Sequence, residues 1–484
     1  MAASGLVFTL QSSSATQADD VSIILVSKEA GPTPFIRNLN LKVSPMTNLL
    51  SVQFTIQPKP GSVTRPISAT YSTRYLLSKG YLDYAGNLKV PVFGLYDGLN
   101  SGVTLNYLFR DNSSKQSVVS VFTPTFRDPC RYNQRIEVQA RSRSTSLSYD
   151  YMILKNSCGY FSPALMDTDG NVRWVGTAGV SNVASAFIDN GVYIGSGAQL
   201  LRMELDGTVT VVGDYSNIGV TDFHHNIDPG KTGLFVEVNT NVDFESVILE
   251  VNKTHGSVRK MWNMATIISR AMRAGGDDPS AFVRPGQDWF HNNSVTYRAS
   301  DDSVIISSRE NFVIALDYKT SGIKWILGDT SKAWYQYPSL RRLALSLPQG
   351  VAPIGQHALS ITYDDRLLLF DDGFHSLSQT PPGISRTYAA PRKYAFNFSY
   401  NAAREIYSYD RPIVSEICSS VYEDARDNYL VDYSVAGGYL SGDSYAELVG
   451  LQPGNQRVFD YKYPTHFCDE IFNAFPIHLE HLSF

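Results

Sequence analysis

Three histidines recur at a constant interval in the middle of the sequence. His225, His291 and His357 are each 66 residues apart, and the pattern Ser-x-Thr-Tyr begins three residues after both His291 and His357. Residues that return at one point of a structural repeat occupy equivalent places in successive units. We therefore expect the three imidazoles to face one another at a single site. His224, which directly precedes His225, is a second candidate for the first of these places.

An amide and a guanidinium accompany the second histidine. Asn293 lies two residues after His291 and therefore shares its strand face, and Arg309 follows the next predicted strand, Ser-Val-Ile-Ile-Ser-Ser. No carboxylate is evident in these motifs. Imidazoles, a fixed cation and a neutral donor suit an anion with several equivalent oxygens, such as a sulfate or phosphate ester, which arginine binds in bidentate fashion. The pattern predicts a cationic, carboxylate-poor site for such an ester.

Two other interpretations of the histidine pattern stay open. The three residues could fall in register by chance or serve packing. Three histidines could also hold zinc or iron, but the permanent charge of Arg309 repels a divalent cation, so we predict no metal. Aromatic residues nearby would suit an aryl group, although such residues also form cores. Those that we predict to bind substrate are Trp289, Phe290 and Trp334.

Composition places the chain among globular proteins. Its 484 residues are 43% hydrophobic and 18% charged, and the formal net charge is -5. The absence of a basic run argues against nucleic acid as the main partner. No apolar run approaches the roughly 18–20 residues that a membrane-spanning helix needs. The N-terminus offers no convincing signal peptide; either such a signal was removed or there never was one.

The cysteines indicate a cellular compartment. Cys130, Cys158, Cys418 and Cys468 lack the Cys-x-x-Cys spacing of zinc or thiol-redox motifs. An even count over a large chain fits two structural disulfides in an oxidising compartment, so we expect a periplasmic or secreted protein. Buried free thiols are the alternative. Among the three possible connectivities we choose Cys130–Cys158 and Cys418–Cys468.

The first 128 residues predict a small N-terminal β-sandwich. Residues 1–20 are rich in Ser, Ala and Gln and are expected to form a loose arm. Short runs with period-two alternation follow, separated by Gly, Pro and Asn turns, for example Leu50-Ser-Val-Gln-Phe-Thr-Ile56. No cluster in this domain could carry chemistry. We therefore expect it to serve packing or assembly, and a homodimer is one candidate assembly.

Residues 129–484 predict a β-propeller of six blades. A hairpin with a polar turn recurs six times, and most copies follow another hairpin, which gives the four strands of a propeller blade. The six copies are 164–174, 201–211, 247–262, 313–325, 394–407 and 448–461. Two insertions, 265–287 and 331–350, end just before histidine-bearing strands. We expect both to overhang the mouth of the central channel, where a loop can act as a lid.

Several of these motifs together resemble the PAPS-independent arylsulfate sulfotransferases. The matching segments are Asp288-Trp-Phe-His-x-Asn-Ser with Ser-Ser-Arg 18 residues on, Asp317-Tyr-Lys-Thr-Ser-Gly-Ile-Lys-Trp-Ile-Leu-Gly-Asp329, Gly355-Gln-His, His224-His225 and Tyr407-Ser-Tyr-Asp-Arg411. The resemblance covers about residues 130–415 well and the N-terminal domain loosely.

This resemblance implies sulfuryl transfer by a ping-pong mechanism through a sulfated histidine. His357 matches the nucleophile of the family, and His225, His291, Asn293 and Arg309 match its sulfuryl-binding and acid/base groups. The implied substrates are an aryl sulfate donor and a phenolic acceptor, and no adenine-nucleotide loop or other cofactor is expected. The rival functions are an aryl sulfate hydrolase, a non-catalytic propeller that binds partners on its rim, and a metal-dependent lyase.

Overall fold

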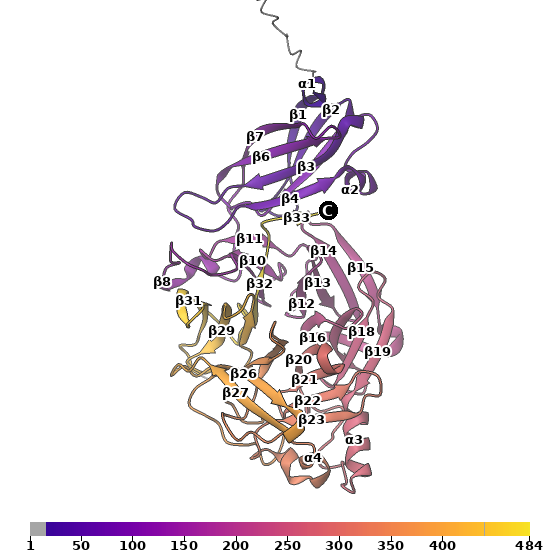
Figure 1. The fold of residues 1–484 in the computed structure, drawn as a ribbon, viewed down its shortest axis with the longest axis vertical. Coiled ribbons are helices and arrows are strands. Elements are labelled where there is room, and N and C mark those ends of the chain that lie inside the picture. Colours follow the sequence, from indigo (N-terminus) through magenta and orange to yellow (C-terminus); the bar gives the residue numbers. More distant parts are fainter. Residues whose placement is uncertain (1–15, 440) are drawn as a thin grey trace, which may run out of the picture.

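The protein folds into an N-terminal β-sandwich that sits at one end of a larger β domain. A computed structural model describes residues 16–439 and 441–484, and Figure 1 shows the two parts one above the other. The predicted arm at 1–20 falls largely outside the described residues, and its last part forms a one-turn helix, α1 (Gln17–Asp20). Within the described residues, no helix is both long and apolar enough to cross a membrane.

Two sheets form the sandwich. In β3, the side chains of Val52, Phe54 and Ile56 are buried, whereas Gln53 and Thr55 are half-buried, so the predicted alternation turns one face of the strand inward. The first sheet has the order β1 (Ser22–Ala30), β2 (Ile36–Ser44), β5 (Asn87–Phe93). The second has the order β33 (Leu482–Ser483), β4 (Ile67–Ser72), β3 (Leu49–Ile56), β6 (Asn100–Phe109), β7 (Ser114–Phe122).

The end of the chain returns to this first domain. Strand β33 pairs in parallel with β4, with Leu482 opposite Ala69, and Phe484 packs against Tyr71 and Tyr75. The predicted assignment of all residues from 129 to 484 to the propeller is therefore wrong for these last residues. Pairing covers the open edge of β4, and an uncovered edge strand invites association with other chains. Figure 1 shows the C-terminus at the junction of the two domains.

Six further sheets of four or five strands make up the rest of the described chain. Each of the six predicted hairpins forms the outer part of one sheet. In order of the chain, the first two sheets are β32 (Asn473–Ile477), β9 (Tyr151–Lys155), β10 (Ala164–Asp167) and β11 (Val172–Val175), and then β12 (Ser185–Ile188), β13 (Gly191–Ser196), β14 (Gln199–Glu204) and β15 (Val209–Asp214). The next two are β16 (Val220–Pro229), β17 (Leu234–Thr240), β18 (Val247–Val251) and β19 (Val258–Asn263), and then β20 (Asn292–Arg298), β21 (Ser303–Ser308), β22 (Val313–Asp317) and β23 (Ile323–Leu327). The last two are β24 (His357–Ile361), β25 (Leu367–Asp371), β26 (Ala390–Asn397) and β27 (Ala402–Ser408), and then β28 (Ser420–Glu423), β29 (Tyr429–Ala436), β30 (Tyr445–Gln452), β31 (Gln456–Pro464) and β8 (Ile136–Gln139).

We interpret these sheets as blades around one axis. The first strands of successive sheets contact one another, from β12 to β16, β20, β24 and β28, and then to β32. Strand β32, near the end of the chain, is the edge strand of the sheet that begins with β9. Main-chain hydrogen bonds therefore join the start and the end of this domain, which is a common way to close a ring of sheets.

The sandwich is docked firmly on the first two of these sheets. One hydrophobic core runs from the sandwich into β9, β11, β13 and β14. At the junction, the guanidinium of Arg173 is buried, donates to the carbonyl of Gly94 and lies 3.7 Å from the ring centroid of Tyr96. Because the shared core is apolar and continuous, the sandwich is a fixed part of the molecule.

The two predicted insertions pack against each other at the far end of the molecule from the sandwich (Figure 1). The first contains α3 (Met264–Ala274). Asn263 caps the start of this helix, because its side chain accepts from the amide of Thr266. The second contains η5 (Ala333–Gln336) and α4 (Pro338–Arg341). Their apolar faces form one cluster with Trp289 and Phe290. The lid function stays a prediction.

The remaining short helices lie in connections between strands. They are α2 (Thr73–Ser78), η1 (Met46–Asn48), η2 (Tyr132–Gln134), η3 (Ser216–Ile218), η4 (Ala299–Asp301) and η6 (Phe398–Tyr400).

Two disulfides pair the four cysteines as predicted, Cys130 with Cys158 and Cys418 with Cys468. The alternative of buried free thiols is therefore excluded for this structure.

Candidate active site

Three neighbouring first strands place the histidines. His225 lies within β16, His291 directly precedes β20 and His357 begins β24, and these strands are adjacent in the ring. The strand pairing shifts register next to each histidine, as in a β-bulge. His225 and His291 have φ of 49° and 53°, a left-handed conformation that costs a side-chain-bearing residue free energy and concentrates at functional sites. The local backbone therefore turns both side chains out of the regular strand pattern.

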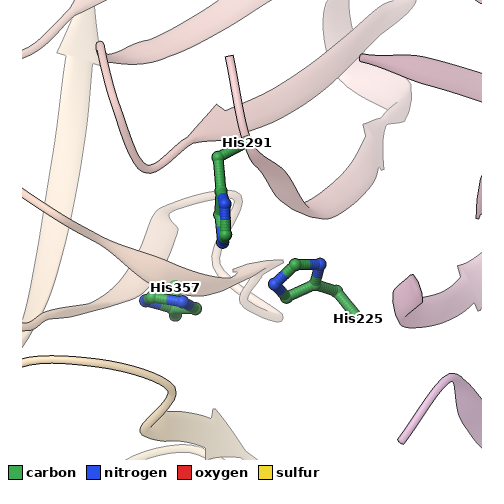
Figure 2. A group of neighbouring side chains, drawn as sticks. All are labelled: His225, His291 and His357. Atoms are coloured by element: carbon green, nitrogen blue, oxygen red, sulfur yellow. The ribbon is translucent and has the colours of Figure 1, made fainter. Parts of the chain in front are cut away.

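The structure brings the three imidazoles together, as the repeat predicts. Ring centroids lie 4.7 Å apart for His225 and His291 and 6.4 Å apart for His225 and His357. One ring nitrogen of each lies within 4.8 Å of those of the other two. Figure 2 shows the rings pointing toward a common centre from three different strands. A small tetrahedral anion can therefore contact all three.

His357 is held as a neutral imidazole. Its Nδ1 lies 2.6 Å from Oδ2 of Asp372 and 3.0 Å from the carbonyl of Gly355, so Nδ1 carries the proton and Nε2 is left as the free nitrogen. Burial is the main cause that lowers the pKa of His357 well below its usual value, and the neighbouring His225 and Arg309 lower it further. Burial also raises the pKa of Asp372 well above its usual value. His357 is thus the nucleophilic candidate at neutral pH.

His291 is in the opposite state. Its Nδ1 lies 2.8 Å from Oε2 of Glu245 and 2.8 Å from Oδ2 of Asp288. Burial disfavours the imidazolium, but the charge of Glu245 and the hydrogen bonds to both carboxylates outweigh burial and raise the pKa of His291 to about 10. Although burial favours a protonated carboxyl, His291 in turn holds the pKa of Glu245 well below its usual range. His291 is therefore a fixed cation at neutral pH.

The predicted absence of carboxylates is wrong. Glu245, Asp288, Glu310 and Asp372 all surround the site. They contact Nδ1 of His291, Nδ1 of His357 or the guanidinium of Arg309 on the side away from the centre. The Nε2 atoms of the histidines and Nη2 of the arginine are therefore left to face the centre. A buried cation needs a counter-charge, and this requirement explains the carboxylates beside His291 and Arg309. Asp288 and Glu310 stood within or beside the quoted motifs, and their positions next to His291 and Arg309 were the signal that the sequence offered.

Arg309 lies directly after β21 and is 2% exposed. Its Nη1 donates to Oε1 of Glu310, and its Nη2 has no protein partner. Glu310 is itself fixed by the amides of Leu377 and Ser378, at 2.7 and 2.9 Å. Burial raises the pKa of Glu310, but the charge of Arg309 outweighs it and brings the value to about 2. The guanidinium is thus held in one orientation and has donor capacity left for an anion.

Lys332 supports the same group from the second insertion. Its Nζ donates to the carbonyl of Arg309 at 2.8 Å, and its side chain is buried. Burial lowers its pKa to about 7. Sequence reasoning missed this residue because nothing in the insertion marks which of its side chains turns inward.

Asn293 has a structural place beside the site. Its Nδ2 donates to the main-chain carbonyl of Gln356 at 2.9 Å. The main-chain carbonyl of Asn293 accepts from Nδ2 of Asn226 at 2.6 Å. The side chain is fully buried. Asn293 therefore links the strand of His291 to the residue that precedes His357, and its predicted role as a direct substrate ligand stays a prediction.

The predicted aryl-binding residues lie in the hydrophobic core. Trp289, Phe290 and Trp334 are all at most 1% exposed and pack with α3 and α4. Apolar side chains of the two insertions cover these rings, so the rings have no surface left to contact a substrate. They therefore support the segment that presents His291, and the expectation that they contact an aryl group needs correction.

Two other aromatic rings do lie beside residues of the site. Phe374 lies 5.7 Å from the guanidinium of Arg309, and the ring of Phe472 lies 5.6 Å from that of His225. Both are half-buried. Phe472 packs in a cluster with the disulfide Cys418–Cys468. Neither ring follows the 66-residue spacing, so the repeat gave no signal for them.

His224 contacts the site through its neighbour. The two Nδ1 atoms of His224 and His225 lie 2.9 Å apart, and Nδ1 of His224 lies 3.9 Å from Oε2 of Glu237. Burial lowers the pKa of both imidazoles, that of His225 well below its usual value. Since Nδ1 of His225 is occupied, its Nε2 is the nitrogen that faces His291 and His357.

The spacing of the three facing nitrogens would also suit a metal ion. The surrounding charge favours an anion instead, because His291 is held as a cation and Arg309 is permanently charged. The three Nδ1 atoms are bound from behind, so a shared ligand can only approach the Nε2 side.

The fold and the site define an all-β protein with a buried, histidine-rich centre whose fixed cations suit a small oxyanion. Family comparison places it more closely. Residues 137–471 match the arylsulfotransferase (ASST) family, and residues 40–124 match the arylsulfotransferase Ig-like domain. The chain belongs to the arylsulfotransferase family.

Individual relatives are distant. Over 241 residues the chain is 24% identical to the arylsulfate sulfotransferase AssT of Escherichia coli O6:H1, and the match covers 46% of this chain and 36% of that protein. Two of the solved structures that are similar to this chain are each 10% identical to it in sequence. A protein of unknown function from Bacteroides thetaiotaomicron has a TM-score of 0.36, with 91% of this chain and 96% of that chain covered. The β-propeller domain of Cps50 (Swd1) from Myceliophteria thermophila has a TM-score of 0.34, with 68% and 100% covered.

Proposed function

We propose that this protein transfers a sulfuryl group from an aryl sulfate to a phenolic acceptor in two steps, through a sulfated His357. The observation that carries the proposal is the convergence of three imidazole nitrogens beside Arg309, with one imidazole neutral and one held as a cation. Family membership supports the reaction class. The donor, the acceptor and the covalent step are the parts that need a test.

In the first step, Nε2 of His357 attacks the sulfur of the donor. A nitrogen–sulfur bond forms, the bond from sulfur to the aryl oxygen breaks, and one of the other facing histidines gives a proton to the departing oxygen. The second step reverses this sequence with a phenolic acceptor, whose proton returns to the protein. The interaction of Asp372 with Nδ1 keeps the Nε2 lone pair directed at the centre.

The charge that spreads over the sulfuryl oxygens meets two fixed cations. By analogy with phosphoryl transfer, such a transition state gains most from preorganised positive groups. His291 and Arg309 are both held from behind by carboxylates, Glu245 and Glu310, so they need no rearrangement during the reaction. Their fixed charge also favours the neutral form of His357.

We assign recognition of the aryl ring to Phe374 and Phe472. Phe374 lies against Arg309 and Phe472 lies against His225, and each ring keeps some exposed surface. Aromatic rings of substrate and protein stack at separations of about 4.5–7 Å. A phenyl group attached to a sulfuryl at the centre would reach one of them.

The disulfides support a periplasmic or secreted location, since such bonds persist in oxidising compartments. Hydrolysis is the nearest rival activity, because water could take the place of the acceptor in the second step. The rate of phenol release with and without an added phenol separates transfer from hydrolysis.

The deciding experiment is single turnover of 4-nitrophenyl sulfate without an acceptor. The wild-type protein should release one equivalent of nitrophenol and gain the mass of one sulfuryl group, in an acid-labile form on the peptide that contains His357. His357→Ala should give neither, while circular dichroism confirms its fold. Unchanged turnover in that variant would remove the covalent step.

A further inference from the structure

One long connection contacts several parts of the site. Residues 372–389 join β25 to β26 and are far longer than the equivalent connections in two other sheets, 197–198 and 309–312. Hairpin connections commonly have about two to five residues, and long loops in compact domains usually serve a function. We call the first part of this connection, residues 372–379, the bridging loop. It begins with Asp372, which contacts Nδ1 of His357 at 2.6 Å.

The bridging loop fixes the counter-charge of Arg309. Oε1 of Glu310 accepts from Nη1 of Arg309, whereas Oε2 faces the loop. Oε2 accepts from the hydroxyl of Ser376, from the amide of Leu377 at 2.7 Å, and from the amide and the hydroxyl of Ser378 at 2.9 and 3.1 Å. A carboxylate with this many donors keeps one orientation, and so does the guanidinium that pairs with it.

The last residue of the bridging loop fixes the segment that leads to His291. Gln379 is 5% exposed, and its Nε2 donates to the main-chain carbonyl of Trp289 at 3.0 Å and to that of Phe282 at 3.1 Å. Trp289 directly follows Asp288, whose carboxylate contacts Nδ1 of His291. Gln379 therefore holds the main chain at the place where His291 and one of its carboxylates are attached.

Ser376 lies where these two sets of contacts meet. Its hydroxyl donates to Oε2 of Glu310 and accepts from the amide of Gln379 at 3.0 Å. Ser376 is 3% exposed. A buried polar side chain with both a donor and an acceptor partner has little freedom to move. The geometry at Glu310 is thus tied to the turn that carries Gln379.

Both insertions fix this connection from outside. Nη2 of Arg284, in the first insertion, donates to the carbonyl of Ser378 at 2.6 Å. The amide of Ile384 donates to the hydroxyl of Ser331, in the second insertion, at 3.2 Å. Supporting hydrogen bonds of this kind keep the groups of a functional site in a productive geometry.

The groups that the bridging loop reaches belong to different sheets. His291 and Arg309 adjoin strands of one sheet, whereas His357 begins the first strand of the next, and Figure 2 shows His291 and His357 on separate strands. Strand pairing fixes each sheet internally, so other contacts must determine how groups on different sheets are placed. A misplacement of about 1 Å can lower the rate of a reaction about 100-fold.

We infer that the bridging loop sets the positions of the two cations relative to the nucleophile, with Ser376 and Gln379 as positioning residues. This inference rests on the proposed sulfuryl transfer. Ser376 acts on Arg309 through the counter-charge of that arginine. Gln379 acts on His291 through the main chain that precedes that histidine.

Double-mutant cycles test this division, because two residues that act through one group are not additive. The measured quantity is the rate constant for single-turnover release of 4-nitrophenol from 4-nitrophenyl sulfate. Ser376→Ala should slow release about tenfold in the otherwise wild-type protein. It should have almost no further effect when combined with Arg309→Ala, and it should keep most of its effect when combined with His291→Ala.

Gln379→Met removes the donor at nearly constant side-chain length and should give the reverse pattern. We expect release to slow about tenfold in the otherwise wild-type protein and in Arg309→Ala, with almost no further effect in His291→Ala. A merely structural role would give the same loss in all three backgrounds. Such additivity for both residues would overturn the inference.

A second serine of the same connection gives a matched control. The hydroxyl of Ser385 contacts Nδ1 and the amide of His375, at 2.7 and 3.0 Å, instead of Glu310. Ser385→Ala should keep the wild-type rate. Ser376→Thr retains the hydroxyl and should recover most of the rate lost in Ser376→Ala. Equal losses in the two alanine variants, or no recovery in a Ser376→Thr protein whose circular dichroism shows an intact fold, would remove Ser376 from the positioning role.

The wild-type protein separates the two levels of the proposal. If it releases nitrophenol without forming sulfated His357, the proposed covalent transfer is wrong. If it forms that intermediate but the cycles are additive, the transfer stands and only the role of the bridging loop is lost.

Discussion

The interior of the sandwich and the centre of the propeller are both buried, but they are built from different groups. The sandwich packs side chains such as Leu105, Phe54 and Val90, all fully buried and apolar. The centre of the propeller buries imidazoles, carboxylates and a guanidinium, each held by a named partner. Apolar packing tolerates exchanges that conserve volume, whereas a buried charge depends on its particular partner. A change at the centre should therefore affect chemistry, and a change in the sandwich should affect stability.

The largest effect should follow the loss of the arginine. Arg309→Ala removes a fixed cation from the proposed place of the sulfuryl oxygens and leaves Glu310 without its partner, so kcat/KM should fall by about 10³-fold. Arg309→Lys keeps the charge but loses the fork of donors and should recover only part of this loss. Steady-state kinetics with 4-nitrophenyl sulfate and a phenol gives the result. A loss below tenfold in the alanine variant would contradict the assigned role.

The next largest loss of activity should follow a change of Asp372, which contacts Nδ1 of the proposed nucleophile His357. In Asp372→Asn the new amide can donate to Nδ1 of His357, which favours the tautomer whose Nε2 carries a proton and cannot attack. Serine hydrolases lose on the order of 10⁴ in rate from such a tautomer change. We expect about 10² here, because the carbonyl of Gly355 still accepts the Nδ1 proton. Asp371→Asn, which breaks ion pairs with Arg386 and Arg392 but pairs with none of the three facing histidines, is the control and should retain kcat.

Removal of one counter-charge should change the pH profile. His291 has a pKa raised to about 10, so its charge is present at all lower pH and is lost as pH rises through that value. Glu245→Gln should lower this pKa and move the alkaline fall of activity to lower pH. Asp288→Asn should do the same to a smaller extent, because the side chain of Asp288 is 38% exposed against 12% for Glu245. Rates from pH 6 to 11 would show both shifts, and an equal profile in all three proteins would contradict the fixed-cation role.

The same linkage makes a statement about stability. Because the folded-state pKa of His291 lies above its ordinary value of about 6.5, its pairing stabilises the fold fully below that ordinary value. This contribution is lost as pH rises toward about 10. The melting temperature of Glu245→Gln should therefore fall below that of wild type at pH 6 and approach it at high pH.

The smallest effect on chemistry should come from the sandwich. Leu105→Ala removes a fully buried side chain and should lower the free energy of unfolding by about 2–5 kcal/mol. Its kcat/KM should equal that of wild type at temperatures where the variant is folded. Thermal melting and kinetics on one sample test both statements. A changed kcat/KM would show that the sandwich and the centre are coupled, and the contrast between the two interiors would then fail.

Much of the fold was predictable because it rests on local patterns. Hairpins such as 164–174 and 247–262 show alternation and turn residues that lie within a dozen or so positions. The place of His225, His291 and His357 was predictable because a repeat carries the same residue to the same strand position. The disulfide pairing agreed as well. The return of Leu482 and Ser483 to the sandwich was not predictable, since two residues carry too little pattern.

The roles of several residues could not be assigned in this way. Tryptophans such as Trp289 and Trp334 are common both in ligand sites and in hydrophobic cores. Only their packing against α3 and α4 shows that these two belong to the core. Asp372 occupies in its blade the place that Arg309 occupies in the preceding one, directly after the second strand. That equivalence became visible only once the strand ends were known.

By itself, the sequence determined an all-β chain whose spaced histidines meet beside an arginine. Only the tertiary structure decided which of these histidines is neutral and which is charged. Strand formation follows from residues close in the chain, but a protonation state follows from burial and from charges a few ångströms away. His291 is charged because of Glu245, which belongs to a loop that no local pattern connects to it, whereas His357 is neutral because it is buried close to the charge of Arg309.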